Sequence, residues 1–155
     1  MIQKASIKEA EILCKQDPVR PNIPYQWRVQ ACWNEIFYLE SNYYSTSEDR
    51  YIHIYDAVLC VAHLNDVPTT ETELMEFDHG SFSIFYTVWS NRKGQGRQII
   101  FDAMDLFKSQ NPPSQRYVTL SPKTEMAMKF HLSNGASLIR ENKFTNNFEY
   151  FLKKT

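Results

Sequence analysis

The sequence has few of the features that mark secreted, membrane or nucleic-acid-binding proteins. It holds only three cysteines, Cys14, Cys32 and Cys60, with no paired ligand spacing. An odd number of distant cysteines argues against a disulfide framework or a zinc site and favours reduced thiols in a cytoplasmic protein. No apolar run approaches membrane-spanning length, and no basic segment followed by an apolar run opens the chain. The formal net charge of −1 gives no field that would attract nucleic acid or an anionic membrane.

Aromatic side chains are the class that the sequence has in excess. They make up 14% of the chain, which indicates a core or pocket rich in rings, while the hydrophobic fraction of 43% is ordinary. A chain of 155 residues has the length of one domain and can bury about 70% of its unfolded surface. No internal repeat, low-complexity tract or linker divides it. We therefore predict a single domain over residues 1–155.

The stretch from residue 81 to residue 108 organises the rest of the chain. Residues 82–88 are rich in β-formers and predict a buried strand, and the apolar positions of 97–108 share one helix face. Between them, Gly94 and Gly96 let the backbone approach a ligand closely, and the first N–H groups of the helix carry the positive end of its dipole. This pattern is typical of a pyrophosphate cradle, although a strand–turn–helix junction without a ligand needs similar residues.

Two other phosphate-binding patterns do not match this stretch. The Walker loop requires Gly-x-x-x-x-Gly-Lys-Ser/Thr, and the dinucleotide fingerprint requires Gly-x-Gly-x-x-Gly. Residue 99 is isoleucine, and no Gly-Lys-Ser/Thr follows.

The remaining segments predict an α/β fold in which two helices precede any strand. Ser6 and Glu9 have the spacing of a capping box, and Pro24 is well placed to open the second helix. A right-handed crossover makes the strand at 116–120 parallel to the one at 82–88. The last helix is expected to turn Met126, Ala127 and Phe130 inward. The predicted segments are helices over 6–15 and 25–40, strands over 51–55 and 57–64 joined near Asp56, a loop over 65–80, a strand over 116–120, a helix over 121–135, and strands over 137–139 and 148–152.

Two of these segments resemble motifs of the GNAT superfamily of acyl-CoA-dependent N-acetyltransferases. Residues 91–96 resemble the family's Gln/Arg-x-x-Gly-x-Gly/Ala, with Asn91 in place of Gln or Arg. Residues 124–135 resemble Asn-x-x-Ala-x-x-x-Tyr-x-x-x-Gly, with His131 in place of tyrosine. The resemblance implies a GNAT-like fold, with a mixed, mostly antiparallel central sheet flanked by helices.

The same resemblance implies a site for acetyl-CoA and no metal. The pantetheine arm would pair with the backbone of Ile84 and Tyr86. His131 would protonate the departing thiolate and project toward the coenzyme, while Phe130 would lie toward the core; a plain helix-surface or core-edge histidine is the alternative. The diphosphate would bind the backbone N–H groups, and the cationic side chains, of Arg92, Lys93, Gly94, Gly96 and Arg97.

An amine acceptor needs a group that takes its proton, because an alkyl amine of pKa about 10.4 is mostly charged at neutral pH. Glu76, Asp78 and His79, just ahead of the core strand, are the candidates. The acidic segment that contains them predicts a cationic acceptor. Direct transfer needs no covalent intermediate, which agrees with the lack of a recognisable Ser–His–Asp or Cys–His constellation in the sequence.

The resulting hypothesis is an N-acetyltransferase that moves an acetyl group from acetyl-CoA to a primary amine. Two alternatives stay open: a catalytically silent module of the same fold that binds coenzyme A or a peptide, and a toxin-like transferase that modifies a protein. The sequence leaves the acceptor unidentified and is compatible with a monomer or a homodimer.

Overall fold

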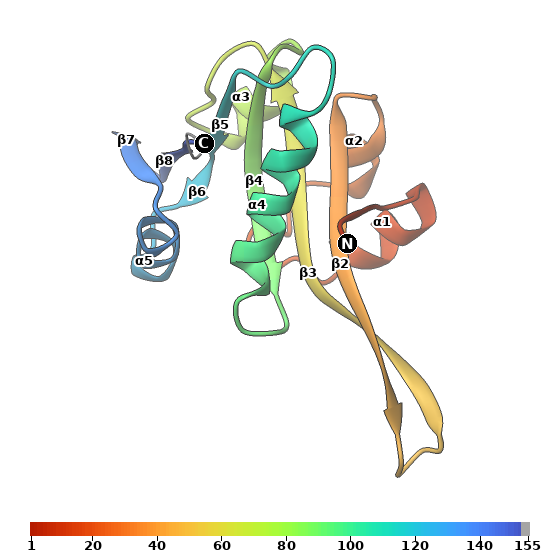
Figure 1. Cartoon of the computed structure of the whole chain (residues 1–155). Coiled ribbons are helices and arrows are strands. Elements are labelled where there is room, and N and C mark those ends of the chain that lie inside the picture. Colours follow the sequence, from red (N-terminus) through yellow and green to blue (C-terminus); the bar gives the residue numbers. More distant parts are fainter. Residues whose placement is uncertain (153–155) are drawn as a thin grey trace.

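A computed structural model describes residues 1–152 and shows one twisted sheet with helices on both faces (Figure 1). The helices are α1 (Ile7–Cys14), α2 (Tyr25–Val29), α3 (Glu71–Glu76), α4 (Gln95–Lys108) and α5 (Glu125–Ser133). The strands are β1 (Gln3–Lys4), β2 (Asn34–Ser45), β3 (Arg50–Leu64), β4 (Phe82–Ser90), β5 (Arg116–Thr119), β6 (Ser121–Pro122), β7 (Ser137–Glu141) and β8 (Thr145–Tyr150).

The sheet is mixed and mostly antiparallel, as the resemblance implied. Its order is β1-β2-β3-β4-β5-β8-β6, and β7 pairs with β8 outside this path. Only β4 and β5 are parallel, because α4 forms the crossover between them. The predicted parallel strand at 116–120 is therefore confirmed.

The two faces of the sheet carry separate apolar layers, and β3 contributes to both. Val58 and Cys60 pack with α1 and α3 on one face, whereas Leu59 and Val61 pack against α4 on the other. This alternation follows from the period of two along a strand. The predicted apolar face of α4 is confirmed, since all of these side chains are buried: Ile99, Ile100, Ala103, Met104 and Phe107.

The predicted helix over 25–40 is wrong beyond its first turn. Helix α2 ends at Val29, and Asn34–Ser45 is strand β2. Ile36 faces one apolar layer and Phe37 the other, so β2 is buried on both faces. A continuous apolar run of this kind does not distinguish a helix from a buried strand. Because β1 precedes α1, the expectation of two helices before any strand is also wrong.

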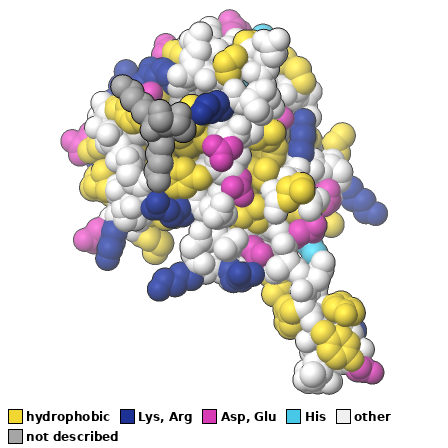
Figure 2. Space-filling model, viewed as in Figure 1, with side chains coloured by type: hydrophobic (Ala, Val, Ile, Leu, Met, Phe, Trp, Pro, Cys, Tyr) yellow, Lys and Arg dark blue, Asp and Glu magenta, His cyan; other side chains and the backbone are white. Residues whose placement is uncertain are grey.

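The predicted strands over 51–55 and 57–64 form one continuous strand. Asp56 is not a junction but the extra residue of a β-bulge, since Leu39 pairs with Ala57 and Glu40 with Tyr55. Beyond the bulge, β2 and β3 continue as a two-stranded arm that projects from the body (Figure 1). The arm carries exposed hydrophobic side chains near its tip (Figure 2), among them Tyr43, Tyr44 and Tyr51.

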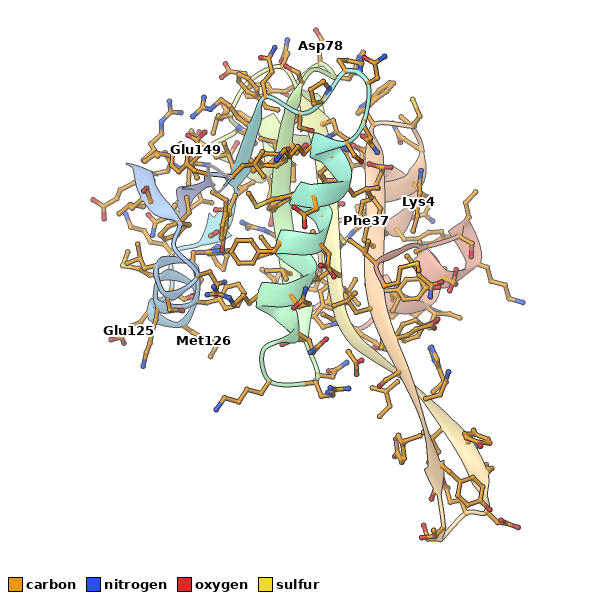
Figure 3. All side chains as sticks on the ribbon, in the orientation of Figure 1. Lys4, Phe37, Asp78, Glu125, Met126 and Glu149 are labelled. Carbon is orange, nitrogen blue, oxygen red and sulfur yellow. The ribbon has the colours of Figure 1, made fainter. Side chains whose placement is uncertain are left out.

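The last helix begins later than predicted and turns partly different residues inward. Ser121–Pro122 is strand β6, and α5 starts after Thr124, whose hydroxyl accepts from the N–H of Ala127 at 3.2 Å. Met126 is 83% exposed and points away from the body (Figure 3), whereas His131 is buried. The inward position predicted for Phe130 is confirmed, since Phe130 packs against the apolar layer of α4. The inward position predicted for Met126 is wrong, and His131 makes the contact with β8 in its place, by stacking on Phe148. None of the helices in residues 1–152 has the length and hydrophobicity that a bilayer-spanning segment needs.

Candidate functional site

Strand β4 is paired on both sides over only part of its length. Its pairing with β5 covers Phe82–Phe85, and the last bond runs from the N–H of Leu120 to the carbonyl of Phe85 at 3.1 Å. From Tyr86 to Ser90 no strand among residues 1–152 pairs with this edge, and the two strands diverge (Figure 1). We call this opening the fork. An unpaired strand edge offers backbone donors and acceptors to an extended ligand.

A β-bulge lies at the point where the fork opens. Phe85 pairs with Val61 and Thr87 with Cys60, so Tyr86 is the extra residue on β4. Its carbonyl faces the fork, where it accepts from the Nε of Arg20 at 3.3 Å. Ile84 pairs with Val118 on β5 and with Ala62 on β3, so it is not on the open edge. The predicted docking edge therefore moves from Ile84 to the segment that begins at Tyr86.

The fork leads into the predicted cradle at the start of α4. Gly94 is the N-cap, with φ +83°, a left-handed conformation that favours glycine. Within residues 1–152 no hydrogen bond uses the backbone N–H of Gly94, Gly96 or Arg97. A Cβ on Gly96 would lie 3.2 Å from the ring of Phe130 on α5, so this glycine allows α5 to approach α4. The cradle thus has free donors at the positive end of a 14-residue helix.

The three cations of the cradle differ in how they are held. Arg92 lies 3.5 Å from the buried carboxylate of Asp56, which also fixes the loop because its carbonyl accepts from the N–H of Asn91. Arg97 stacks over Phe101 at 5.0 Å and donates to the carbonyl of Ser133 at 3.4 Å. Lys93 is exposed. The anion-binding role of all three stays a prediction.

Arg20 occupies the fork and was missed from the sequence. Its guanidinium donates to the carbonyl of Tyr86 and, at 2.7 Å, to the carbonyl of Leu120, so it bridges the two strands where they separate. Its third contact is Glu71 on the first turn of α3, at 3.0 Å. Arg20 lies in a proline-rich connection without any motif, so no sequence signal pointed to it.

A buried ion pair holds the segment that carries Arg20. Asp17 and Arg28 are 2.7 Å apart, and neither side chain is exposed. Asp17 also accepts from the N–H of Arg20 at 2.9 Å and from the hydroxyl of Thr87 at 3.1 Å. Arg28 in turn donates to the carbonyl of Arg20 at 2.6 Å. The pair therefore links the connection before α2 to the open half of β4.

His131 has a different setting from the predicted one. It is 4% exposed, stacks on Phe148 and lies 2.7 Å from the hydroxyl of Tyr150 through Nδ1. Burial lowers the pKa of His131 to about 4, so the imidazole is neutral at pH 7. The expected orientation is wrong as well, because Phe130 rather than His131 lies against the cradle at Gly96. The proton-donating role of His131 stays a prediction, and this neutral, buried ring favours a positioning role for it.

The other predicted acid–base groups lie at the opposite end of β4 from the cradle. Glu76 ends α3, and Asp78 and His79 follow it ahead of β4, as the position of Asp78 at the top of Figure 3 shows. The cradle follows the carboxyl end of β4, eight or nine residues farther along an extended strand, or roughly 30 Å at 3.3 Å per residue. The structure therefore does not bring these three residues together with the cradle. They line a separate pocket.

Four side chains that lie far apart in the sequence form one hydrogen-bonded series in the structure. Glu35 lies 2.7 Å from Nε2 of His63, whose Nδ1 lies 2.9 Å from the hydroxyl of Ser83. Ser83 reaches Ser114 at 2.6 Å. The four residues come from three strands and a loop, so no spacing revealed them, and the statement that no Ser–His–acid constellation exists is corrected. Because Ser83 is fully buried, we interpret this series of hydrogen bonds as a polar link between strands.

Among residues 1–152 no group of three or more His, Cys, Asp or Glu side chains could hold a metal ion.

Comparisons with known proteins identify the fold. No family model matches the sequence, and no curated protein matches it. The structure is similar to malonyl-CoA decarboxylase from Agrobacterium vitis, with a TM-score of 0.73 and 13% identity. That match covers 99% of this chain and 60% of the decarboxylase chain, so the chain spans less than two thirds of that protein.

Two acetyltransferases match over nearly their whole length. Arabidopsis thaliana NAA60 in complex with acetyl-CoA has a TM-score of 0.61 at 12% identity, covering 98% of both chains. A Bacillus subtilis acetyltransferase in complex with CoA has a TM-score of 0.57 at 10% identity, also covering 98% of both chains. The chain therefore has the GNAT-like fold that the two motifs predicted.

Proposed function

We propose that the chain is an acyl-CoA-dependent N-acyltransferase that moves an acetyl group from acetyl-CoA to a primary amine in one direct step. The observation that carries the proposal is the continuity of the fork with the cradle. The unpaired edge of β4 runs from Tyr86 to Ser90 and ends at the free N–H groups of Gly94, Gly96 and Arg97. An extended ligand with a diphosphate at one end fits such a surface, because its amide groups can pair with the strand edge and its phosphates with the helix.

The residues of the fork would act on the reacting groups by position and hydrogen bonding. The thioester supplies the activated acyl group, and a backbone N–H at the edge beyond the bulge would stabilise the oxyanion that forms on it. Phe130 would cover the cradle from the side of α5. Arg92, Lys93 and Arg97 would add positive charge near the diphosphate.

Glu71 pairs with Arg20 at 3.0 Å, and its side chain is 38% exposed, whereas the other carboxylate near Arg20, that of Asp17, is fully buried. We propose Glu71, in place of the distant Glu76, Asp78 and His79, as the group that accepts the proton of the attacking amine. An amine that enters from the side of α3 would meet Glu71 before it reaches the strand edge. Arg20 would hold this carboxylate in place.

The proposal is tested by measuring acyl transfer directly. The protein is incubated with acetyl-CoA and a panel of amines, and thiol release and product mass are read together. We expect amine-dependent thiol release, and a KM for acetyl-CoA that rises at least about tenfold in Gly96→Val, equivalent to about 1.4 kcal/mol of lost binding. Gly135→Ala is the control, because Gly135 follows α5, away from the start of α4, and a Cβ there would meet nothing within 4 Å.

Three outcomes would overturn the proposal. Binding of coenzyme A without any acylated amine would indicate the silent module. Acylation of proteins alone would indicate the toxin-like transferase. Malonyl-CoA is included as a second donor because the Agrobacterium vitis protein carries the name of a malonyl-CoA decarboxylase. Release of carbon dioxide from malonyl-CoA without amine transfer would indicate decarboxylation instead.

A further inference from the structure

A second hollow lies at the amino end of β4, on the face that carries α2 and α3. Its volume is about 370 Å³, within the range of about 300–1,000 Å³ for small-molecule sites. Trp27 and Trp33 form aromatic walls, and Trp33 stacks on His79 with ring centroids 5.2 Å apart. We call this hollow the aromatic pocket. Aromatic faces attract organic cations through their ring quadrupole.

A buried acceptor in this pocket lacks a donor. Asn34 lines the pocket and is 4% exposed. Its Nδ2 donates to the carbonyl of Trp27 at 2.9 Å, which fixes the amide. Its Oδ1 has no hydrogen-bond partner within residues 1–152. Because an unsatisfied buried acceptor is costly, a ligand that donates an N–H or O–H to Asn34 would be favoured in this pocket.

The charges around the pocket have one sign. Glu76 and Asp78 line it, both are exposed, and neither forms an ion pair within the described part of the chain. None of the eleven lining residues is lysine or arginine. Aromatic walls, a free acceptor and two carboxylates together select an organic cation with N–H donors, which is an alkylammonium group.

Helix α3 places this pocket within reach of the fork. Glu71, on its first turn, contacts Arg20 at the fork, and Glu76, at its end, lines the aromatic pocket. Five steps at 1.5 Å per residue separate the two positions by about 7.5 Å along the helix axis. A flexible molecule with an amine at each end can span this distance.

We infer that the aromatic pocket binds the distal ammonium group of a diamine or polyamine whose other amine reaches the fork. The inference rests on the proposed acyl transfer and names its acceptor class. Asn34 accepts from the ammonium, Trp27 and Trp33 surround it, and the two carboxylates balance its charge. The acidic residues ahead of β4, Glu76 and Asp78, thus act in holding the acceptor rather than in taking its proton.

Binding is measured without acetyl-CoA, so that it does not depend on transfer. The full chain is titrated with 1,5-diaminopentane by calorimetry and by tryptophan fluorescence, and 1-pentanol serves as the uncharged comparison. We expect saturable diamine binding that weakens at least about tenfold in the double variant Glu76→Gln/Asp78→Asn and in Trp33→Leu. Glu125→Gln is the matched control, because Glu125 is exposed on α5, away from the pocket (Figure 3).

Equal affinity of the diamine for wild type and both variants, or binding of 1-pentanol as strong as that of the diamine, would overturn the inference. Failure of the proposed function would look different. In that case the diamine would bind and the variants would weaken it, yet no acylated amine would form. Conversely, transfer to diamines with a KM for the diamine that is unchanged in both variants would contradict diamine binding in the aromatic pocket, while the proposed acyl transfer would stand.

Discussion

From Phe82 to Phe85, β4 is paired with β3 on one side and β5 on the other, whereas from Tyr86 to Ser90 it is paired with β3 alone. Functional side chains lie next to the paired half: the hydrogen-bonded series Glu35–His63–Ser83–Ser114 and the side chains of the aromatic pocket. The open half offers backbone groups. Arg20 lies in the fork beside it, and the buried Asp17–Arg28 pair holds the segment that carries Arg20. The two halves of one strand therefore present different kinds of binding group.

This difference decides how each half responds to substitution. Backbone donors cannot be removed by changing a side chain, so the open half is sensitive to whatever holds the backbone in place or fills the space in front of it. In the paired half, the binding groups are the side chains themselves, and each can be deleted singly. Substitutions at the two halves should thus differ in size and in what they affect.

The largest difference is expected between Asp17→Ala and Ser83→Ala. Asp17→Ala leaves the guanidinium of Arg28 buried without a counter-charge, which should reduce the free energy of unfolding by about 3–5 kcal/mol. Ser83→Ala removes the two hydrogen bonds of its hydroxyl, to His63 and to Ser114, and should cost about 2 kcal/mol. Urea unfolding monitored by circular dichroism measures both. Similar losses in the two variants would show that the open half does not depend on the buried pair.

A smaller effect concerns α5, which closes the cradle through Phe130. The pKa of His131 is about 4 in the folded chain and about 6.5 when unfolded, so the unfolded state binds more protons between these values. Stability is therefore full above pH 6.5 and falls as the pH drops toward 4, by up to about 3 kcal/mol. His131→Gln should remove this part of the pH dependence.

The control is Met126→Gln on the same helix, which removes no titratable group and changes a side chain that is 83% exposed. Free energies of unfolding are compared from pH 4 to pH 7. A slope that persists unchanged in His131→Gln would mean that other groups account for it, and that His131 does not tie α5 to β8 as the contacts indicate.

The smallest effect separates strain from function at two glycines. Gly94 and Gly135 both have positive φ, and a Cβ at either position would meet nothing within 4 Å. Alanine should therefore cost about 1 kcal/mol of stability at each. Only Gly94→Ala should also weaken coenzyme A binding, by a few-fold in calorimetry, because its methyl group would stand where the phosphates approach. Equal affinities in the two variants would remove Gly94 from the cradle.

Some elements of the fold could be predicted because residues close together in the sequence determine them. The capping box at Ser6 and Glu9 is confirmed by both of its hydrogen bonds. The apolar spacing of α4 specified a helix, and Gly94, its N-cap, specified where it starts. These features depend on backbone preferences and periodicity within one turn or one strand, so the sequence contains them directly.

Other elements could not be predicted from local pattern. The run from Asn34 to Leu39 is buried on both faces of the sheet, and its neighbours β1 and β3 decide that it is a strand. The residue that joins α5 to β8 is His131, whose ring contacts Phe148 and the hydroxyl of Tyr150. Asn134, the C-cap of α5, donates to the same hydroxyl. In both cases the partner that decides the outcome lies far away in the sequence.

The sequence by itself determined the cradle, the helix behind it and the α/β class, because glycine geometry and helical periodicity act over a few residues. Only the tertiary structure decided the fork, the position of Arg20 within it and the aromatic pocket. Arg20 meets Tyr86 and Leu120 across 66 and 100 residues. Such contacts exist only once the sheet has assembled, since they require side chains from separate elements to converge on one end of a strand.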